Sequence, residues 1–133
     1  MNEFNFESSV CTSIEQSKRL LALGLKKETA DMVWTKMARI SGTFYVPELA
    51  PINMVLWRHT PAWSLDRLRE LIPENIFTGV RNQWHRVMYN GILTYEEGDD
   101  SLVSFREANI YDRCISCIEW LIKEGYFNKE YLV

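Results

Sequence analysis

Cys114 and Cys117 are the residues whose spacing most directly suggests chemistry, because C-x-x-C is common to redox pairs and zinc sites. A redox pair needs a helix N-terminus to lower a thiol pKa. This pair instead falls deep inside an amphipathic helical pattern, on its apolar side. A zinc site would need two further ligands, and Cys11, His59 and His85 are scattered along the chain. The sequence therefore predicts two buried, unreactive thiols and gives no reason to expect a metal or a cofactor.

Arginine and both histidines concentrate between residues 58 and 86. This basic window offers candidate anion or nucleic-acid contacts, namely Arg58, His59, Arg67, Arg69, Arg81, His85 and Arg86. Asp66 and Glu70 can pair with two of these arginines, so a solvated, charge-paired surface is the favoured interpretation. Nucleic-acid binding through the window is the alternative function. A small enzyme using His59 or His85 ranks last, because no nucleophile–base pair, phosphate loop or HExxH motif is present.

The acidic run at residues 96–100, Glu-Glu-Gly-Asp-Asp, has the residue types of a calcium loop. An EF-hand loop, however, alternates its ligands and lies between two helices. This run is expected between strands, so we predict an acidic turn.

A long C-terminal helix is the element around which the chain is organised. Ser104 and Glu107 match a capping box, and Gly125 suits the left-handed residue that ends a helix. Between them, apolar residues recur at three- and four-residue steps and cover about half of the helix circumference. The pattern predicts a core helix over residues 104–125.

Trp120 is the exception on this helix, because the helical wheel places it among polar residues such as Arg113 and Glu124. An indole in that position must be covered by this chain's own tail or by a partner chain, and both alternatives stay open. The aromatic tail begins directly after Gly125. The predicted interaction surface therefore consists of Trp120, Tyr126, Phe127 and Tyr131.

The N-terminal part predicts a pair of helices. Residues 1–10 are expected to be weakly ordered. Thr12 and Glu15 match a capping box for a helix that Gly24 ends, and residues 26–32 favour a second short helix. The pair resembles half of a helix-turn-helix, but its second member lacks the long polar side chains of a recognition helix.

The central part predicts one capped helix and two short strands. Residues 43–46 and 52–57 have strand propensity. Ser64 can cap a helix over residues 65–72, which Pro73 ends because the residue before proline avoids the α region.

Alternating apolar residues then predict an antiparallel meander. Residues 84–89 and 92–96 flank Asn90-Gly91, a dipeptide suited to a type I′ turn. Residues 102–103 can return as a third strand that leads into the long helix.

Composition is that of an ordinary globular protein, with 133 residues, a net charge of −3 and three cysteines. An acidic chain lacks the surface that general nucleic-acid binding needs, and an odd cysteine count cannot complete a disulfide framework. No apolar run reaches the length of a membrane span, and the first residues do not match a signal peptide. We expect a cytoplasmic protein without membrane contact. Its predicted fold is a single α+β domain over residues 1–133, with an N-terminal helix pair, a central short helix, an antiparallel β-meander and a long C-terminal helix packed on the sheet.

Three segments, SIEQSKRLLALGLKKETADM, PAWSLDRLRELIP and IEWLIKEGYFNKEYL, resemble short uncharacterised proteins from prophage and mobile-element regions of gut bacteria. The resemblance implies a phage-accessory or mobile-element context and no known activity. Together with the aromatic surface, it favours a non-enzymatic interaction protein whose partner is another protein or a second copy of the chain.

Overall fold

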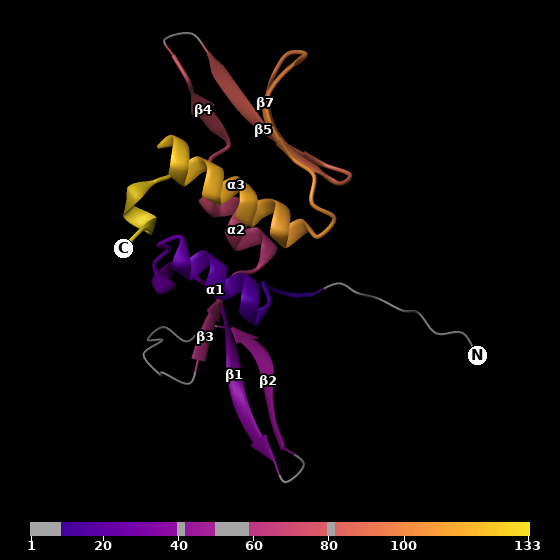
Figure 1. The fold of residues 1–133 in the computed structure, drawn as a ribbon, viewed down its shortest axis with the longest axis vertical. Helices are drawn as coiled ribbons and strands as arrows, with labels where there is room; N and C mark the ends of the chain where they lie inside the picture. Colours follow the sequence, from indigo (N-terminus) through magenta and orange to yellow (C-terminus); the bar gives the residue numbers. More distant parts are fainter. Residues whose placement is uncertain (1–8, 40–41, 50–58, 80–81) are drawn as a thin grey trace, which may run out of the picture.

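Two antiparallel sheets lie on opposite sides of a central group of helices in the computed structural model, which describes residues 9–39, 42–49, 59–79 and 82–133 (Figure 1). The helices are α1 (Ile14–Ala22), α2 (Leu65–Leu71) and α3 (Ile110–Glu124), and the 3₁₀ turns are η1 (Lys27–Thr29) and η2 (Lys129–Tyr131). The first sheet, ordered β2-β1-β3, contains β1 (Met32–Arg39), β2 (Gly42–Leu49) and β3 (His59–Ala62). The second sheet follows chain order and contains β4 (Asn75–Phe77), β5 (Gln83–Tyr89), β6 (Ile92–Glu97) and β7 (Asp100–Phe105). The predicted α+β class is confirmed.

The long C-terminal helix packs on the second sheet as predicted, but it begins later. Its N-cap is Asn109, whose side-chain oxygen accepts from the amides of Tyr111 at 2.9 Å and Asp112 at 3.2 Å. Ser104, the predicted cap, lies in β7, where its hydroxyl donates to Thr94 Oγ1 at 3.0 Å. Pairing with β6 thus outweighs the local capping signal. Gly125 ends the helix with φ 83°, as predicted.

The predicted N-terminal helix pair is wrong. The first member exists as α1, but its capping box joins Ser13 to Gln16, one position after the predicted pair. The second member is only the turn η1, after which the chain extends from Met32 into β1. The physical reason is that β1 pairs with β2 along its whole length, which offers hydrogen bonds that an isolated second helix of this length would lack.

The central helix and the meander form largely as predicted. Ser64 caps α2 by accepting from the Arg67 amide, and β5, β6 and β7 form an antiparallel meander, to which β4 adds an edge strand. The turn between β5 and β6 has one left-handed residue, Gly91 with φ 75°, and Asn90 does not share its positive φ. It is therefore not the predicted type I′ turn, which needs positive φ at both positions.

The sequence predicted the first sheet only in part. The predicted strand at 43–46 lies inside β2, which continues through Pro47; proline is tolerated there because β2 is an edge strand. The predicted strand at 52–57 lies outside the described residues, as do the first eight of the ten residues expected to be weakly ordered.

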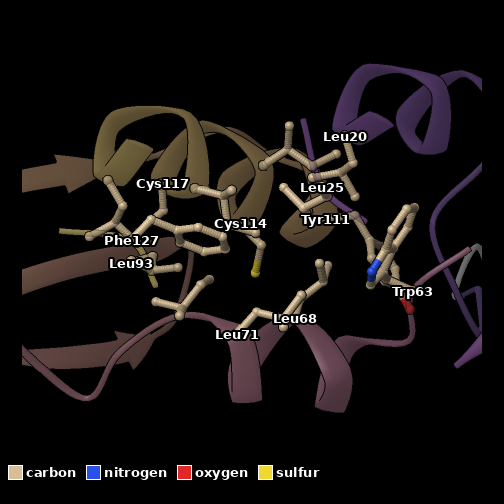
Figure 2. Close-up of a cluster of buried hydrophobic side chains, with 14 of the residues drawn as sticks. Leu20, Leu25, Trp63, Leu68, Leu71, Leu93, Tyr111, Cys114, Cys117 and Phe127 are labelled. Atoms are coloured by element: carbon tan, nitrogen blue, oxygen red, sulfur yellow. The ribbon is translucent and has the colours of Figure 1, made fainter. Parts of the chain in front are cut away.

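The hydrophobic core lies where the three helices meet the second sheet (Figure 2). Its labelled members come from α1 and the turn after it, from α2 and the residues before it, from β6, from α3 and from the tail, namely Leu20, Leu25, Trp63, Leu68, Leu71, Leu93, Tyr111, Cys114, Cys117 and Phe127. All are at most 6% exposed. Burying each large apolar side chain contributes about 1.5–3 kcal/mol, so this junction supplies much of the stability.

A buried polar cluster joins the first sheet to the helices. Thr12 is fully buried; its hydroxyl accepts from the Trp63 amide at 3.1 Å and lies 2.8 Å from Ser17 Oγ. The Trp63 indole donates to Thr29 Oγ1 at 3.0 Å, and the Trp34 indole of β1 donates to the Thr12 carbonyl at 2.8 Å. These hydrogen bonds hold the segment that precedes α1 in the chain to segments that follow it.

Candidate functional site

The C-x-x-C pair is buried in the core. Cys114 and Cys117 are both 0% exposed on α3, and Cys11 is 1% exposed. Burial raises the pKa of Cys114 and of Cys11 to about 11 and raises that of Cys117 further. All three thiols are therefore protonated at neutral pH. Among the described residues, no three histidine, cysteine or acidic side chains group as metal ligands would.

The two histidines do not share a site. His59 is half-buried on β3, and its Nδ1 is buried without a hydrogen-bond partner in the described part of the chain. His85 is exposed on β5, where Nδ1 lies 2.5 Å from Asn75 Oδ1. The two residues belong to different sheets on opposite sides of the helices, so they cannot act together on one substrate.

The described residues of the basic window are divided among β3, α2 and β5. Arg67 is half-buried, donates through Nη1 to the Thr29 carbonyl at 2.9 Å and pairs through Nε with Glu70 Oε1 at 3.4 Å. Arg69 on the same helix is exposed. Arg58 and Arg81 lie outside the described residues.

Arg86 has a structural role at the end of α2. Its Nη1 donates to the carbonyls of Arg69 at 2.8 Å and Ile72 at 2.7 Å, and Nη2 lies 4.0 Å from Glu74 Oε1. A guanidinium on the last carbonyls of a helix satisfies acceptors that have no partner within the helix and complements the helix dipole. The guanidinium of Arg86 is thus already engaged in hydrogen bonds within the fold.

The acidic run at residues 96–100 forms the turn between β6 and β7, as predicted. Glu97 and Asp100 are opposite one another in the strand register, and Gly98 adopts φ 60° between them.

Trp120 is covered mainly by the second sheet. Its indole is half-buried, stacked on Tyr95 of β6 and edge-on to Phe105 of β7, each with ring centroids 6.4 Å apart. Tyr126 of the tail lies 5.7 Å away on another side. The tail therefore contributes to the cover, but the sheet, which the helical wheel could not indicate, supplies most of the neighbouring rings.

The aromatic tail lines a groove beside the end of α2, which we call the tail groove. Its volume is about 250 Å³, and its lining is Glu70, Leu71, Pro73, Tyr126, Phe127, Asn128 and Tyr131. Phe127 is 5% exposed and lies edge-on to Tyr131 at 5.8 Å, while Tyr126 and Tyr131 are half-buried. The structure thus brings three of the four predicted aromatic residues together in one groove, and the fourth, Trp120, contacts the ring of Tyr126.

The end of the tail is fixed to the loop after α1. The amide of Lys26 donates to the Tyr131 carbonyl at 2.8 Å, and the amide of Val133 donates to the Gly24 carbonyl at 2.8 Å. Leu25 and Leu132 form an isolated antiparallel bridge between them. The wall of the tail groove is therefore held in place by backbone hydrogen bonds.

Sequence reasoning missed Arg113, which it treated as part of the polar side of α3. The residue is only 8% exposed and lines a cleft of about 370 Å³ together with Leu65, Arg69, Met88, Tyr89, Asn90, Gly91 and Ile110. We call this the arginine cleft. The helical wheel does not indicate this burial: the guanidinium donates to the Glu107 and Ala108 carbonyls just before α3, and residues from α2 and the β5–β6 turn line the same cleft.

Comparison with protein families, with curated proteins and with solved structures gives no match to this chain. Among the helices that the structure describes, none has both the length and the apolar character needed to cross a membrane.

Proposed function

We propose that this chain is a non-enzymatic interaction protein of phage or mobile-element origin that binds a partner protein through the tail groove. The observation that carries the proposal is the clustering of Tyr126, Phe127 and Tyr131 around a groove beside Pro73. Aromatic residues are enriched at the centres of protein interfaces, where they fill or form pockets. The resemblance of three segments to short prophage proteins supports the phage or mobile-element context.

The chemistry of the groove favours an apolar side chain as the anchor of the partner. Phe127 and Leu71 form a buried base, while Tyr126 and Tyr131 keep part of each ring accessible. Glu70 at the rim pairs with Arg67 at 3.4 Å, but its side chain is 71% exposed, so its carboxylate remains accessible to a basic group next to the anchor. A pre-formed groove also limits the ordering cost of binding.

Photo-crosslinking in the native host tests the proposal. A photoreactive phenylalanine analogue placed at Glu70, on the rim, should give a covalent adduct with one partner. The same analogue at Phe77, which is 63% exposed on β4, is the matched control and should give none. Tyr131→Ala should weaken the Glu70 adduct, since tyrosine is enriched among the few interface residues whose truncation costs about 2 kcal/mol or more of binding.

The outcomes separate the candidates. An adduct with the mass of two chains would identify self-association. Equal adducts from both positions, or an adduct that survives Tyr131→Ala, would contradict a site in the tail groove.

Nucleic-acid binding through the window at residues 58–86 is a weaker proposal, supported by the exposed side chains of Arg69 and His85. Arg67 and Arg86 are engaged within the fold, which leaves few basic groups for phosphates. Affinity for duplex DNA should stay at the non-specific level of roughly 10⁻⁴–10⁻⁶ M, and a tight, salt-sensitive complex weakened by Arg69→Ala would reverse this ranking. An enzyme using either histidine has the least support, because the two lie on different sheets.

A further inference from the structure

The arginine cleft contains a buried cation that has no carboxylate partner. Arg113 Nε donates to the Glu107 carbonyl at 2.6 Å and Nη2 donates to the Ala108 carbonyl at 3.2 Å. Both acceptors are neutral backbone groups, and within the described part of the chain no carboxylate lies within 4.0 Å of this guanidinium. The Glu107 carboxylate itself accepts a hydrogen bond from the Ser116 hydroxyl. A buried charge of this kind is normally paired, so its missing counter-ion points to a ligand.

The remaining donors of Arg113 are available to such a ligand. Two of the five guanidinium N–H groups are used by the backbone, and Nη1 has no acceptor among the residues that the structure describes. Arg69 lines the same cleft, is exposed, and makes no ion pair in the described residues. Arg69 of α2 and Arg113 of α3 therefore line one cleft, whose lining contains no acidic residue.

The charges that act on the buried thiol of Cys114, next to Arg113 on α3, agree with this geometry. Burial raises the pKa of Cys114 to about 11, and three cations oppose that rise, the guanidinium groups of Arg113, Arg86 and Arg69. Arg86 is close to Glu74 and occupied by the end of α2, whereas the other two cations line the cleft. The charged side chains that act on Cys114 are therefore all arginines, in a chain whose net charge is −3.

Three apolar side chains contribute to the lining of the arginine cleft. Leu65 of α2, Met88 of β5 and Ile110 of α3 line it alongside the two arginines. The volume of about 370 Å³ lies near the lower end of the range for small-molecule sites. Guanidinium groups bind carboxylates and phosphates through paired, charge-assisted hydrogen bonds.

We propose that the arginine cleft binds a small organic anion, with its carboxylate or phosphate on Arg113 and Arg69 and its apolar part against Leu65, Met88 and Ile110. This site lies in a different cleft from the tail groove and does not depend on the proposed partner protein.

Titration of the full chain with phenyl phosphate, benzoate, inorganic phosphate and benzyl alcohol tests the proposal. Calorimetry measures the affinity, and amide chemical shifts locate the site. Phenyl phosphate or benzoate should bind with a Kd at or below about 1 mM and shift the amides of Asn90, Gly91 and Ile110. Inorganic phosphate should bind about ten-fold more weakly than phenyl phosphate because it lacks the apolar part, and neutral benzyl alcohol should not saturate the site. Which of the two organic anions binds more tightly distinguishes a phosphate from a carboxylate ligand.

Variants distinguish the cleft from general anion binding. Arg69→Ala removes an exposed side chain and should weaken phenyl phosphate about ten-fold or more without changing the fold. Arg113→Lys keeps the charge but loses the paired donors, and should also weaken binding. Arg19→Ala, on α1 beside Glu119, removes the same charge away from the cleft and should leave the Kd unchanged.

Three results would overturn the proposal. They are no saturable binding of either organic anion, chemical-shift changes that lie outside the cleft, or an equal effect of Arg19→Ala and Arg69→Ala. Binding of single-stranded or duplex DNA without binding of the small anions would also overturn it, in favour of a nucleic-acid surface.

Discussion

Thr12→Val is the sharpest test of how the two sides of the molecule are joined. The substitution is nearly isosteric, so it changes hydrogen bonding much more than packing. Thr12 is 0% exposed, and its hydroxyl accepts from the Trp63 amide at 3.1 Å and lies 2.8 Å from Ser17 Oγ. Valine would leave both groups without a partner in a site that water does not reach.

The expected cost follows from counting the groups that lose partners. A buried polar group left without a hydrogen bond costs about 1–3 kcal/mol, so two of them give about 2–6 kcal/mol. Ser17→Ala alone should cost about 1 kcal/mol, because the Thr12 hydroxyl still accepts from Trp63. In the double variant only the Trp63 amide lacks a partner, so its cost should fall short of the sum of the single variants by about 2–4 kcal/mol.

Urea unfolding of the four proteins measures these differences through the midpoint and the slope. Thr43→Val, at an exposed position of β2, is the matched control and should change the free energy of unfolding by less than about 0.5 kcal/mol. If Thr12→Val behaves like this control, or if the two single variants are additive, the polar cluster does not join the sheet to the helices as described.

Three further predictions address the thiols, the end of α2 and the tail. Burial raises the pKa of Cys11 and of Cys114 from 9.0 to about 11 in the folded state, so these thiols stay protonated to higher pH when folded than when unfolded. Their contribution to the free energy of unfolding should therefore be fully present below pH 9 and fall between pH 9 and pH 11. The slope should be at most about 1.4 kcal/mol per pH unit for each thiol, and flat stability across that range in urea unfolding would contradict it. Arg86→Met should lower the free energy of unfolding by about 2–3 kcal/mol, because the α2 carbonyls lose a charged donor; a loss below about 0.5 kcal/mol would show that this contact is dispensable. Deleting residues 129–133 should cost about 2–4 kcal/mol through lost backbone hydrogen bonds and apolar contacts. That deletion should leave the emission of Trp120 unchanged, measured as a difference against Trp120→Phe, since the rings that cover the indole remain; a red shift would mean that the tail end is its main cover.

The elements that the sequence predicted well are those whose signals are local. Ser64 needs only the amide three residues ahead to cap α2, and Gly125 needs only its own backbone freedom to end α3. Asn90-Gly91 likewise placed the turn of the meander, although not its type.

The elements that the sequence did not predict depend on distant partners. β1 becomes a strand because β2 and β3 pair with it on either side. The residues of β1 alone do not indicate that it has both partners. At Ser104, helix capping competes with strand pairing in the same way. Its capping signal is real, but pairing of β7 with β6 satisfies more backbone groups than one early helical turn would.

Arg113 and Trp120 show one limit of the helical wheel, which allows for only one buried side of α3. Arg113 and Trp120 are seven residues apart, so they differ by only about 20° around an ideal helix. That side of α3 follows the second sheet. Near the end of the helix the sheet offers the rings of Tyr95 and Phe105, which cover part of the Trp120 indole. Near its start the same side meets the β5–β6 turn, where a cleft remains and the buried side chain is a cation. The side of α3 that appeared polar in the sequence is therefore a second buried side, apolar at its C-terminal end and positively charged at its N-terminal end. A ligand that matches the charged end must be an anion.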